Sequence, residues 1–451
     1  MKSESRYLYQ ETENTLLDII SEMEIGDRLP PERELLLNMN VSMITLKRAL
    51  NNLSDQGILQ RFVGRGTFIQ QKPDRVDKKV PLLFTWDALS NLNWDKMNPV
   101  PDKRIFPGAD YYTKLADALR KKIIPDVMFM ASQFPDFQEQ ATFMNLDHGK
   151  LNIPPAGSYF DILNQNFSDY SFRFALPLLF SCQLIAVSSH KKYRGLAEEL
   201  QQCQFDSYLD FADYIQEKFQ QPTMFFPEYL QLYLSQSSEF FDPQSGASLF
   251  DIEAGRTALI RLKKGFEDGI ISNPYTSSIP GEIDLFQSGK RAIVGPIFAF
   301  SLRDLSGKFD LILPPFGKDN ANIINAIGLT IHSESKQSDL SAKLLTSISS
   351  EKSVMKLARE GRGFPADKSL CKQFLKENYP LLDFATFEDE IAGSQLNSFN
   401  SEEKLIHHTI IEDAVDFLSG TISLSDAAGN TRQKLAHLVK PKKDYLNFPV
   451  V

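Results

Sequence analysis

Apolar residues near the start of the chain recur with helical spacing in two successive stretches. The first stretch runs from Tyr7 to Met23 and is followed by Gly26, a residue that destabilises helix interiors. A second, shorter helix is predicted from Pro31 to about Met39, because proline is accepted at the first helical position. The start of the chain therefore predicts two helices, each with one apolar face.

A third helix is predicted after Ser42, whose side chain can cap free backbone N–H groups. Leu46, Ala49, Leu50 and Leu53 follow at three- and four-residue steps, so they share one face that should pack against the first two helices. The opposite face carries Ile44, Thr45, Lys47, Arg48 and Asn51.

Residues 57–71 form two short alternating runs around Gly64-Arg65-Gly66, a pattern that predicts a hairpin with a basic tip. Three helices followed by a hairpin make a winged helix-turn-helix. We expect this domain to occupy residues 1–70.

The remaining residues predict a larger α/β unit. Residues 71–79 are polar and lack apolar periodicity, as expected of a linker. From Val80, an apolar run, a helical stretch at 111–122 and a second apolar run at 125–131 predict strand, helix and strand, and hence a parallel sheet with crossover helices. A chain of 451 residues exceeds the size of one core, so a multidomain protein is predicted, with an α/β unit at 80–451.

Charge and composition limit the partners of the chain. A net charge of −9 argues against a basic coat over the whole surface but allows one local basic patch. The first twenty residues lack the apolar core of a secretory signal, and no later apolar run is long enough to span a membrane. We expect a cytoplasmic protein without membrane association. The three cysteines contain no C-x-x-C pair, so we expect them to be packing residues.

Residues 26–35, 41–42, 45–50, 57–59 and 64–68 resemble the GntR family of bacterial transcription regulators, and the resemblance covers essentially residues 7–70. It implies that this domain contacts operator DNA through its second helix, its recognition helix and its wing. Where the family commonly has arginine after the serine, this chain has Met43 and Ile44, which can lie against thymine methyl groups; alternatively, Met43 packs against the second helix. The candidate DNA-binding residues are Arg33, Ser42, Met43, Ile44, Thr45, Lys47, Arg48, Gly64 and Arg65.

Several segments of the larger unit, in the same order, resemble the family 1 extracellular solute-binding proteins of sugar transporters. The clearest are residues 125–128, 174–187, 285–300 and 357–370. The resemblance implies a two-lobed type II periplasmic-binding-protein fold with crossovers near 182–190 and 295–300. The chain departs from the usual pattern at 188–192 and at Ile297-Phe298, which leaves the ligand open.

In such a fold the ligand lies between the lobes, against loops at the carboxyl ends of strands. Sugar recognition needs aromatic faces for C–H patches and polar groups for hydroxyls, and both kinds occur there. Any single aromatic can instead be a core residue, because the chain has 34 phenylalanines. The candidate ligand-binding residues are Trp86, Asp87, Ser132, Gln133, Phe134, Phe180, Glu228, Tyr229, Gly295, Phe298, Arg362 and Phe364.

These features together predict a regulator that binds a palindromic operator as a homodimer, senses a carbohydrate and needs no cofactor. A sensor of another small solute is an open alternative. A pyridoxal-phosphate, aminotransferase-like domain is a second one, but Asn98-Pro99 and Asn273-Pro274 lack the second proline of its N-P-x-x-P-like segment. A transport receptor conflicts with the missing signal peptide. We expect no enzyme, because no nucleophile elbow and no phosphate loop occur and the adjacent His407 and His408 cannot chelate one ion.

Overall fold

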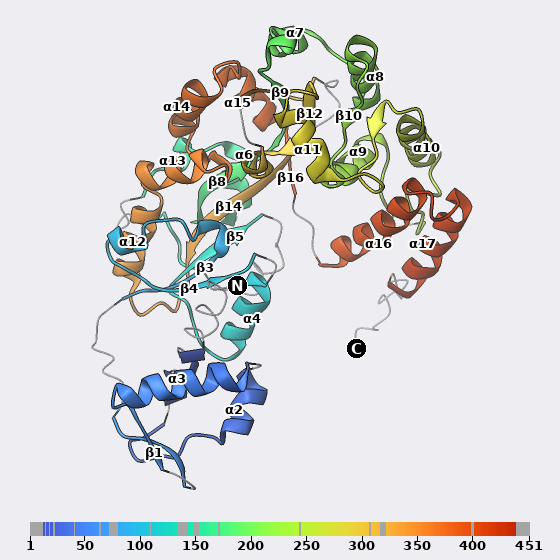
Figure 1. The fold of residues 1–451 in the computed structure, drawn as a ribbon. Helices are drawn as coiled ribbons and strands as arrows, with labels where there is room; N and C mark the ends of the chain where they lie inside the picture. Colours follow the sequence, from blue (N-terminus) through green and yellow to red (C-terminus); the bar gives the residue numbers. More distant parts are fainter. Residues whose placement is uncertain are drawn as a thin grey trace, which may run out of the picture. The chain divides into compact units, whose positions relative to one another are not determined.

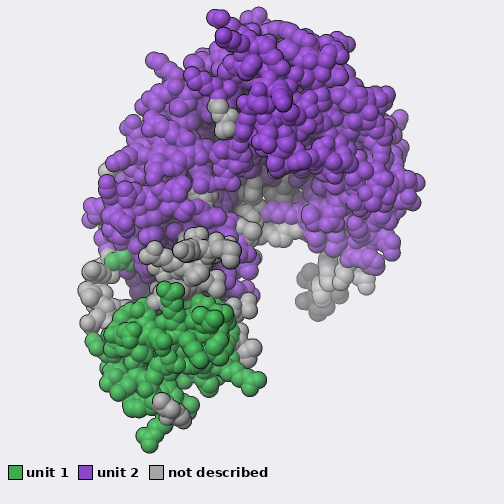
Figure 2. Space-filling model, viewed as in Figure 1, with its two compact units in different colours: residues 1–80 green, residues 81–451 purple. Residues whose placement is uncertain are grey.

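The structure is a computed structural model that forms two compact units, residues 1–80 and 81–451 (Figure 2). It describes residues 12–13, 15–17, 19–20, 23–39, 41–62, 65–71, 80–108, 110–132, 143–147, 153–169, 172–242, 245–305, 308–315, 322–397 and 401–438. Among the helices in these ranges, none is long and apolar enough to cross a membrane.

Unit 1 is a small helical domain with a hairpin (Figure 1). Residues 12–20 are helical wherever they are described. The other elements are α2 (Glu32–Met39), α3 (Met43–Asp55), β1 (Leu59–Phe62) and β2 (Gly66–Ile69). The two strands pair antiparallel. Leu46, Ala49, Leu50 and Leu53 are buried against Leu16 and other apolar residues of the first two helices and the hairpin, which confirms the predicted winged helix-turn-helix.

The first lobe of unit 2 is built on a seven-stranded sheet with the order β15-β8-β14-β5-β3-β4, in which β16 also pairs with β14. Its strands are β3 (Leu82–Trp86), β4 (Asp102–Phe106), β5 (Val127–Ala131), β8 (Ala175–Ser181), β14 (Ile323–Ile331), β15 (Phe364–Pro365) and β16 (Gln395–Leu396). β3 runs parallel to β4 and β5, whereas β14 runs antiparallel to both of its long neighbours, β5 and β8. The sheet is therefore mixed.

Helices pack around this sheet and close the larger of two cores in unit 2, which also contains residues of the second lobe's sheet, among them Leu184, Val294 and Leu311. They are α4 (Tyr111–Arg120), α6 (Asp161–Asn166), α12 (Ser338–Ile348), α13 (Glu351–Arg359), α14 (Lys368–Asn378) and α15 (Phe384–Ala392). A two-stranded ribbon, β6 (Ser168–Asp169) and β7 (Phe172–Arg173), precedes β8.

The second lobe has a five-stranded sheet with the order β11-β10-β12-β9-β13 and its own core. Its strands are β9 (Gln183–Ser188), β10 (Thr223–Met224), β11 (Ile271–Ser272), β12 (Ile293–Phe298) and β13 (Phe309–Ile312). Its helices include α7 (Leu196–Gln202), α8 (Tyr208–Phe219), α9 (Leu230–Ser237), α10 (Glu253–Glu267), α11 (Ile279–Gln287), α16 (Ser401–Leu418) and α17 (Leu424–Leu438). Figure 1 shows α16 and α17 beside α10, so the end of the described chain returns to this lobe.

The chain passes between the lobes at several points. β8 leads through Cys182 into β9, and β12 leads into a 3₁₀ helix, η6 (Ala299–Asp304), whose Leu302 belongs to the core of the first lobe. Figure 2 shows that the side of unit 2 that faces the viewer is hollowed. We call the region where the lobes meet the junction.

The expected strand, helix and strand at the start of the unit are β3, α4 and β5. The sequence analysis missed β4 and the antiparallel β14. β4 is an edge strand of the sequence DKRIF, and only Phe106 is fully buried, so it lacks the apolar run that marks an interior strand. The direction of β14 follows from its late return across the sheet, which local periodicity does not record.

Substitution of the fully buried Leu46 by alanine should destabilise unit 1. Leu46 lies in the centre of its core, and truncation of a buried leucine costs about 2–5 kcal/mol through lost contacts and a residual cavity. Urea unfolding should show the loss in the transition of this unit. The neighbouring exposed Lys47→Ala should stay within about 0.5 kcal/mol of the parent. An equal loss in both variants would contradict the assignment of faces.

Candidate nucleic-acid interface and ligand site

The recognition helix α3 begins with a side-chain cap. Ser42 Oγ accepts a hydrogen bond from the Thr45 N–H at 3.1 Å, and the two hydroxyl groups lie 2.7 Å apart. This cap fixes the start of the helix, and the buried face described above turns the other side outward. Met43 is 43% exposed and Ile44 is 82% exposed.

The other candidate DNA-binding side chains also lie on the surface of unit 1. Lys47 and Arg48 are exposed on α3, Arg33 is exposed on α2, and Arg65 is exposed beside the wing strand β2. Gly64 lies outside the described residues. Acidic and basic residues balance within residues 1–80, so the net charge of −9 belongs to residues 81–451 and leaves these cations without a surplus of acids in their own unit.

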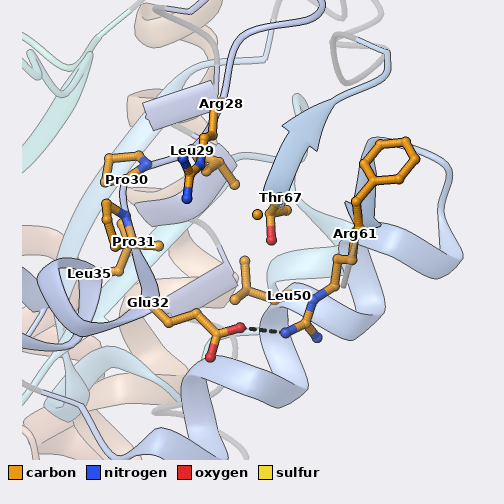
Figure 3. A pocket seen from close by; sticks show the side chains of 11 residues that line it. Arg28, Leu29, Pro30, Pro31, Glu32, Leu35, Leu50, Arg61 and Thr67 are labelled. Carbon is orange, nitrogen blue, oxygen red and sulfur yellow. Dashed lines mark hydrogen bonds and ion pairs between the residues drawn. The ribbon is translucent and has the colours of Figure 1, made fainter. Parts of the chain in front are cut away.

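A hollow of about 450 Å³ lies between the start of α2 and the wing, and Figure 3 shows the side chains around it. Arg61 of β1 crosses its edge, forms an ion pair with Glu32, and donates a hydrogen bond to Asn51 Oδ1 at 2.5 Å. One guanidinium thus links α2, α3 and the hairpin. Such planar, multiply bonded arginines are geometrically specific, so Arg61 holds the wing against the recognition helix. The sequence analysis did not single it out.

Arg28 borders the same hollow and lies against the wing glycine. A Cβ atom placed on Gly66, which has a φ of +111°, would lie 2.5 Å from Arg28 Nε. Glycine at this position therefore serves two purposes, because it allows the positive φ and leaves room for the arginine.

In unit 2, strand register brings candidate ligand residues to the junction. β3, β5 and β8 all end there: Ala131 pairs with Ile327 and Ser181 with Asn325, near the start of β14. In the second lobe β12 runs antiparallel to β9, so Phe298 ends opposite Gln183, where β9 begins. Strand ends of both lobes therefore lie at the junction.

One group of side chains at the junction combines aromatic and charged residues. Phe298 and Phe300 stack with ring centroids 5.4 Å apart and an interplanar angle of 7°. Burial, and then the charge of nearby Arg303, lower the pKa of Arg362. We call the set Trp86, Asp87, Phe298, Phe300, Arg303 and Arg362 the junction group. The sequence analysis missed Phe300 and Arg303, although the alternation in Phe298-Ala299-Phe300 was a usable signal.

Other candidates lie inside the protein and must be corrected. Phe180 and Phe364 are each 1% exposed and pack on one another at 5.8 Å in the core of the first lobe. Tyr229 is 2% exposed among Tyr208 and Phe225 in the second core. These rings have no face free for a ligand, because neighbouring rings already cover them.

Two small candidates have structural roles of their own. The fully buried Ser132 donates its backbone N–H to Ala326 O and accepts the Ala326 N–H on Oγ, both at 2.9 Å. Gly295 has a φ of +128°, and a Cβ atom there would lie 2.6 Å from Leu184 O, so it permits close approach of β12 to β9. Gln133 and Phe134 lie outside the described residues, as does the side chain of Glu228.

A buried asparagine joins the lobes at the junction. Asn322 Oδ1 accepts the Gln183 N–H at 2.9 Å, and its Nδ2 donates to Gln183 O at 2.9 Å and to Glu390 Oε1 at 3.1 Å. Burial raises the pKa of Glu390, and the hydrogen bond from Asn322 partly opposes this. The first residue of β9 is thereby fixed to the residue that precedes β14.

Residues 8–69 match the model of the bacterial regulatory proteins of the gntR family. The chain is 37% identical over 78 residues to a probable fructoselysine utilization operon transcriptional repressor of Escherichia coli K12, across 16% of this chain and 32% of that protein. It is 31% identical over 107 residues to the mannosyl-D-glycerate transport/metabolism system repressor MngR of the same organism, across 23% of this chain and 44% of that protein. The chain thus spans less than half of either relative. Unit 1 is a winged helix-turn-helix of GntR type.

Sugar-binding proteins of transporters share the fold of unit 2. The ABC substrate-binding protein Lmo0181 of Listeria monocytogenes, solved with cycloalternan, has a TM-score of 0.60 at 15% identity over 79% of this chain and 98% of its own. The GacH receptor of Streptomyces glaucescens has a TM-score of 0.60 at 18% identity over 81% and 100%. At these identities the likeness establishes the two-lobed α/β fold.

Replacement of Glu390 by glutamine should stabilise the protein at neutral pH. The pKa of Glu390 is raised in the folded protein. The free energy of unfolding therefore falls as the pH rises from the pKa of this carboxyl in the unfolded chain to its pKa in the folded protein, and it stays lower at higher pH. Glutamine keeps an acceptor for Asn322 and removes the buried charge. Urea unfolding should show a gain at pH 7 that disappears below the ordinary range of a glutamate.

The exposed Glu402→Gln serves as the control, and its stability should change little at either pH. A pH-independent effect of Glu390→Gln would contradict the assignment.

Proposed function

We propose that this chain is a cytoplasmic transcription regulator in which the solute-binding-like unit senses a carbohydrate and alters the binding of a homodimer to a palindromic operator. The main observation in support is that one chain joins a GntR-type DNA-binding domain to a unit with the fold of sugar-binding proteins. The proposal contains no catalytic step and no cofactor.

The surface of unit 1 supports the DNA-binding part of this proposal. The exposed side of α3 offers two apolar side chains for base methyl groups and two cations for phosphates or base edges. Arg33 and Arg65 add cations on the second helix and at the wing, the elements that flank a recognition helix in such domains. The ion-paired Arg61 holds the wing in place.

The two lobes support the sensing part. The two lobes have separate sheets that are joined by crossovers at the junction, so rotation of one lobe about the junction is the conformational change that this architecture favours. A ligand that binds the closed form more tightly shifts the population toward it. In a dimer, that shift changes the spacing of two DNA-binding domains and hence operator affinity.

The fold weighs against the alternatives. A pyridoxal-phosphate aminotransferase-like regulator would need a different α/β fold in residues 81–451, where this chain matches sugar-binding proteins. The fold is shared with transport receptors, but an N-terminal DNA-binding domain has no role in a receptor that delivers solute to a transporter. A sensor of a non-sugar solute is separated from our proposal by the effector test below.

Lys47→Ala and Arg65→Ala should each weaken binding to a duplex selected by the protein from random sequences. Loss of one phosphate contact should reduce the salt dependence of log K by a slope of about 1. Fluorescence anisotropy at several salt concentrations measures both effects. Lys343→Ala, which removes an exposed lysine of α12 in unit 2, should change neither. Unaltered binding by both head variants would remove the proposed interface.

The effector should raise the melting temperature of the protein and shift the protein concentration needed for the footprint. Ligand binding to the folded state stabilises it by about 2.7 kcal/mol when the ligand is at 100 times its Kd. A carbohydrate panel screened by thermal melting and then by footprinting tests this. If DNA binding is intact but no carbohydrate acts, the regulator stands and the effector class is wrong.

A further inference from the structure

The ring of Phe300 forms an apolar ledge at the junction and stacks on the ring of Phe298, which is only 8% exposed. Phe300 is 36% exposed, and neither ring belongs to the two hydrophobic cores of unit 2 as far as its residues are described. Each lies at the end of β12 or just after it, beside the crossover, because the Phe300 N–H is bonded to Ser181 Oγ at 3.2 Å. An exposed aromatic face beside a crossover suits a sugar ring, whose C–H patches pack on aromatic surfaces.

Within the junction group, Arg362 is the charged residue that lacks a hydrogen-bond partner for a buried nitrogen. Its side chain is partly buried, its Nε is buried without a hydrogen-bond partner, and no described carboxylate lies within 4.0 Å of its guanidinium. Arg303 lies next to it: a Cβ atom on Gly361 would be 2.9 Å from Arg303 Cβ. A partly desolvated guanidinium beside a second one is costly unless an anion is bound.

None of the surrounding carboxylates pairs with Arg362 within the described residues, although Asp304 pairs with Arg303. Glu360 accepts from Asn91 Nδ2 at 3.3 Å and lies 3.8 Å from Lys356 Nζ, while Asp304 lies 3.7 Å from Arg303. Asp87, which is exposed at the end of β3, lies near Arg362 but forms no ion pair with it within the described residues. The ledge thus has a cationic donor on one side and a free carboxylate acceptor available for hydroxyl groups.

Trp86 adds a second donor without an acceptor. Its Nε1 is buried and has no hydrogen-bond partner among the described residues, although its ring is fixed against Tyr111 at 6.0 Å. Buried donors in folded proteins are nearly always paired. A ligand that is rich in acceptor oxygens would satisfy a donor of this kind.

We propose that the junction group selects an anionic carbohydrate, whose acidic group pairs with Arg362 and Arg303, whose ring lies on Phe300, and whose hydroxyls donate to Asp87. This inference deepens the proposed function and rests on it. The shared chemistry is a sugar ring with an acidic substituent. The acidic substituent can be a carboxylate, a sulfate or a phosphate group.

The full-length protein is tested against an array of neutral, uronate-containing, sulfated and phosphorylated oligosaccharides, and hits are measured by calorimetry. Acidic glycans should bind at least tenfold more tightly than their neutral counterparts, as charge-assisted pairing of arginine implies. The array also distinguishes the three acidic groups.

Variants then assign the selectivity to residues. Arg362→Gln should abolish the preference for the acidic glycan, and Arg303→Gln, at a half-exposed site that tolerates substitution, should reduce it. Phe300→Ala should weaken acidic and neutral glycans alike. Arg359→Gln on the exposed surface of α13, where Arg359 pairs with Glu377, is the matched control and should leave binding unchanged.

The outcomes separate this inference from the function on which it rests. Preferred binding of neutral glycans, or an acidic preference that survives both Arg362→Gln and Arg303→Gln, would overturn the inference and leave carbohydrate sensing in place. Binding of no glycan at all would overturn both, while DNA binding by unit 1 would be unaffected.

Discussion

The hydrogen bonds of Asn322 are the constraint on which the arrangement of unit 2 depends. Asn322 is 4% exposed and bonds both backbone groups of Gln183, the first residue of β9. It precedes β14, the central strand of the other sheet. A fully satisfied buried amide is geometrically specific, because losing one bond leaves a polar group unpaired in the interior. The two sheets therefore keep a fixed meeting point, and one buried apolar cluster contains residues of both sheets.

This meeting point explains why candidate residues from distant parts of the chain gather there. Trp86 ends β3 and Phe298 ends β12, so strand register brings both near the crossover, while Arg362 shortly precedes β15, which pairs with β8. Neither sheet could supply the aromatic ledge and the guanidinium groups by itself, because η6 leaves a strand of the second sheet and enters the core of the first lobe.

The sequence predicted best those features that depend on neighbours along the chain. Helix periodicity identified the buried face of α3, and alternation identified the hairpin, since both patterns repeat within a few residues. The candidate ligand site was predicted only in outline. Phe180 and Phe364 follow the same strand-end rule as Phe298, but other rings cover them, and tertiary packing of this kind leaves no local signal. Arg303 was missed because Arg362, the arginine that lies near it in the structure, is distant in sequence.

The contact between Arg28 and Gly66 has a consequence for how such domains diverge. The two positions lie in different segments, yet a side chain at residue 66 would occupy the space of the guanidinium. Descendants that enlarge position 66 would have to keep a positive φ there and move the end of the Arg28 side chain at the same time. Across an alignment of close relatives, the loop before α2 and the wing should therefore evolve as one unit, and chimaeras that exchange the wing alone should fold less well than those that exchange both segments.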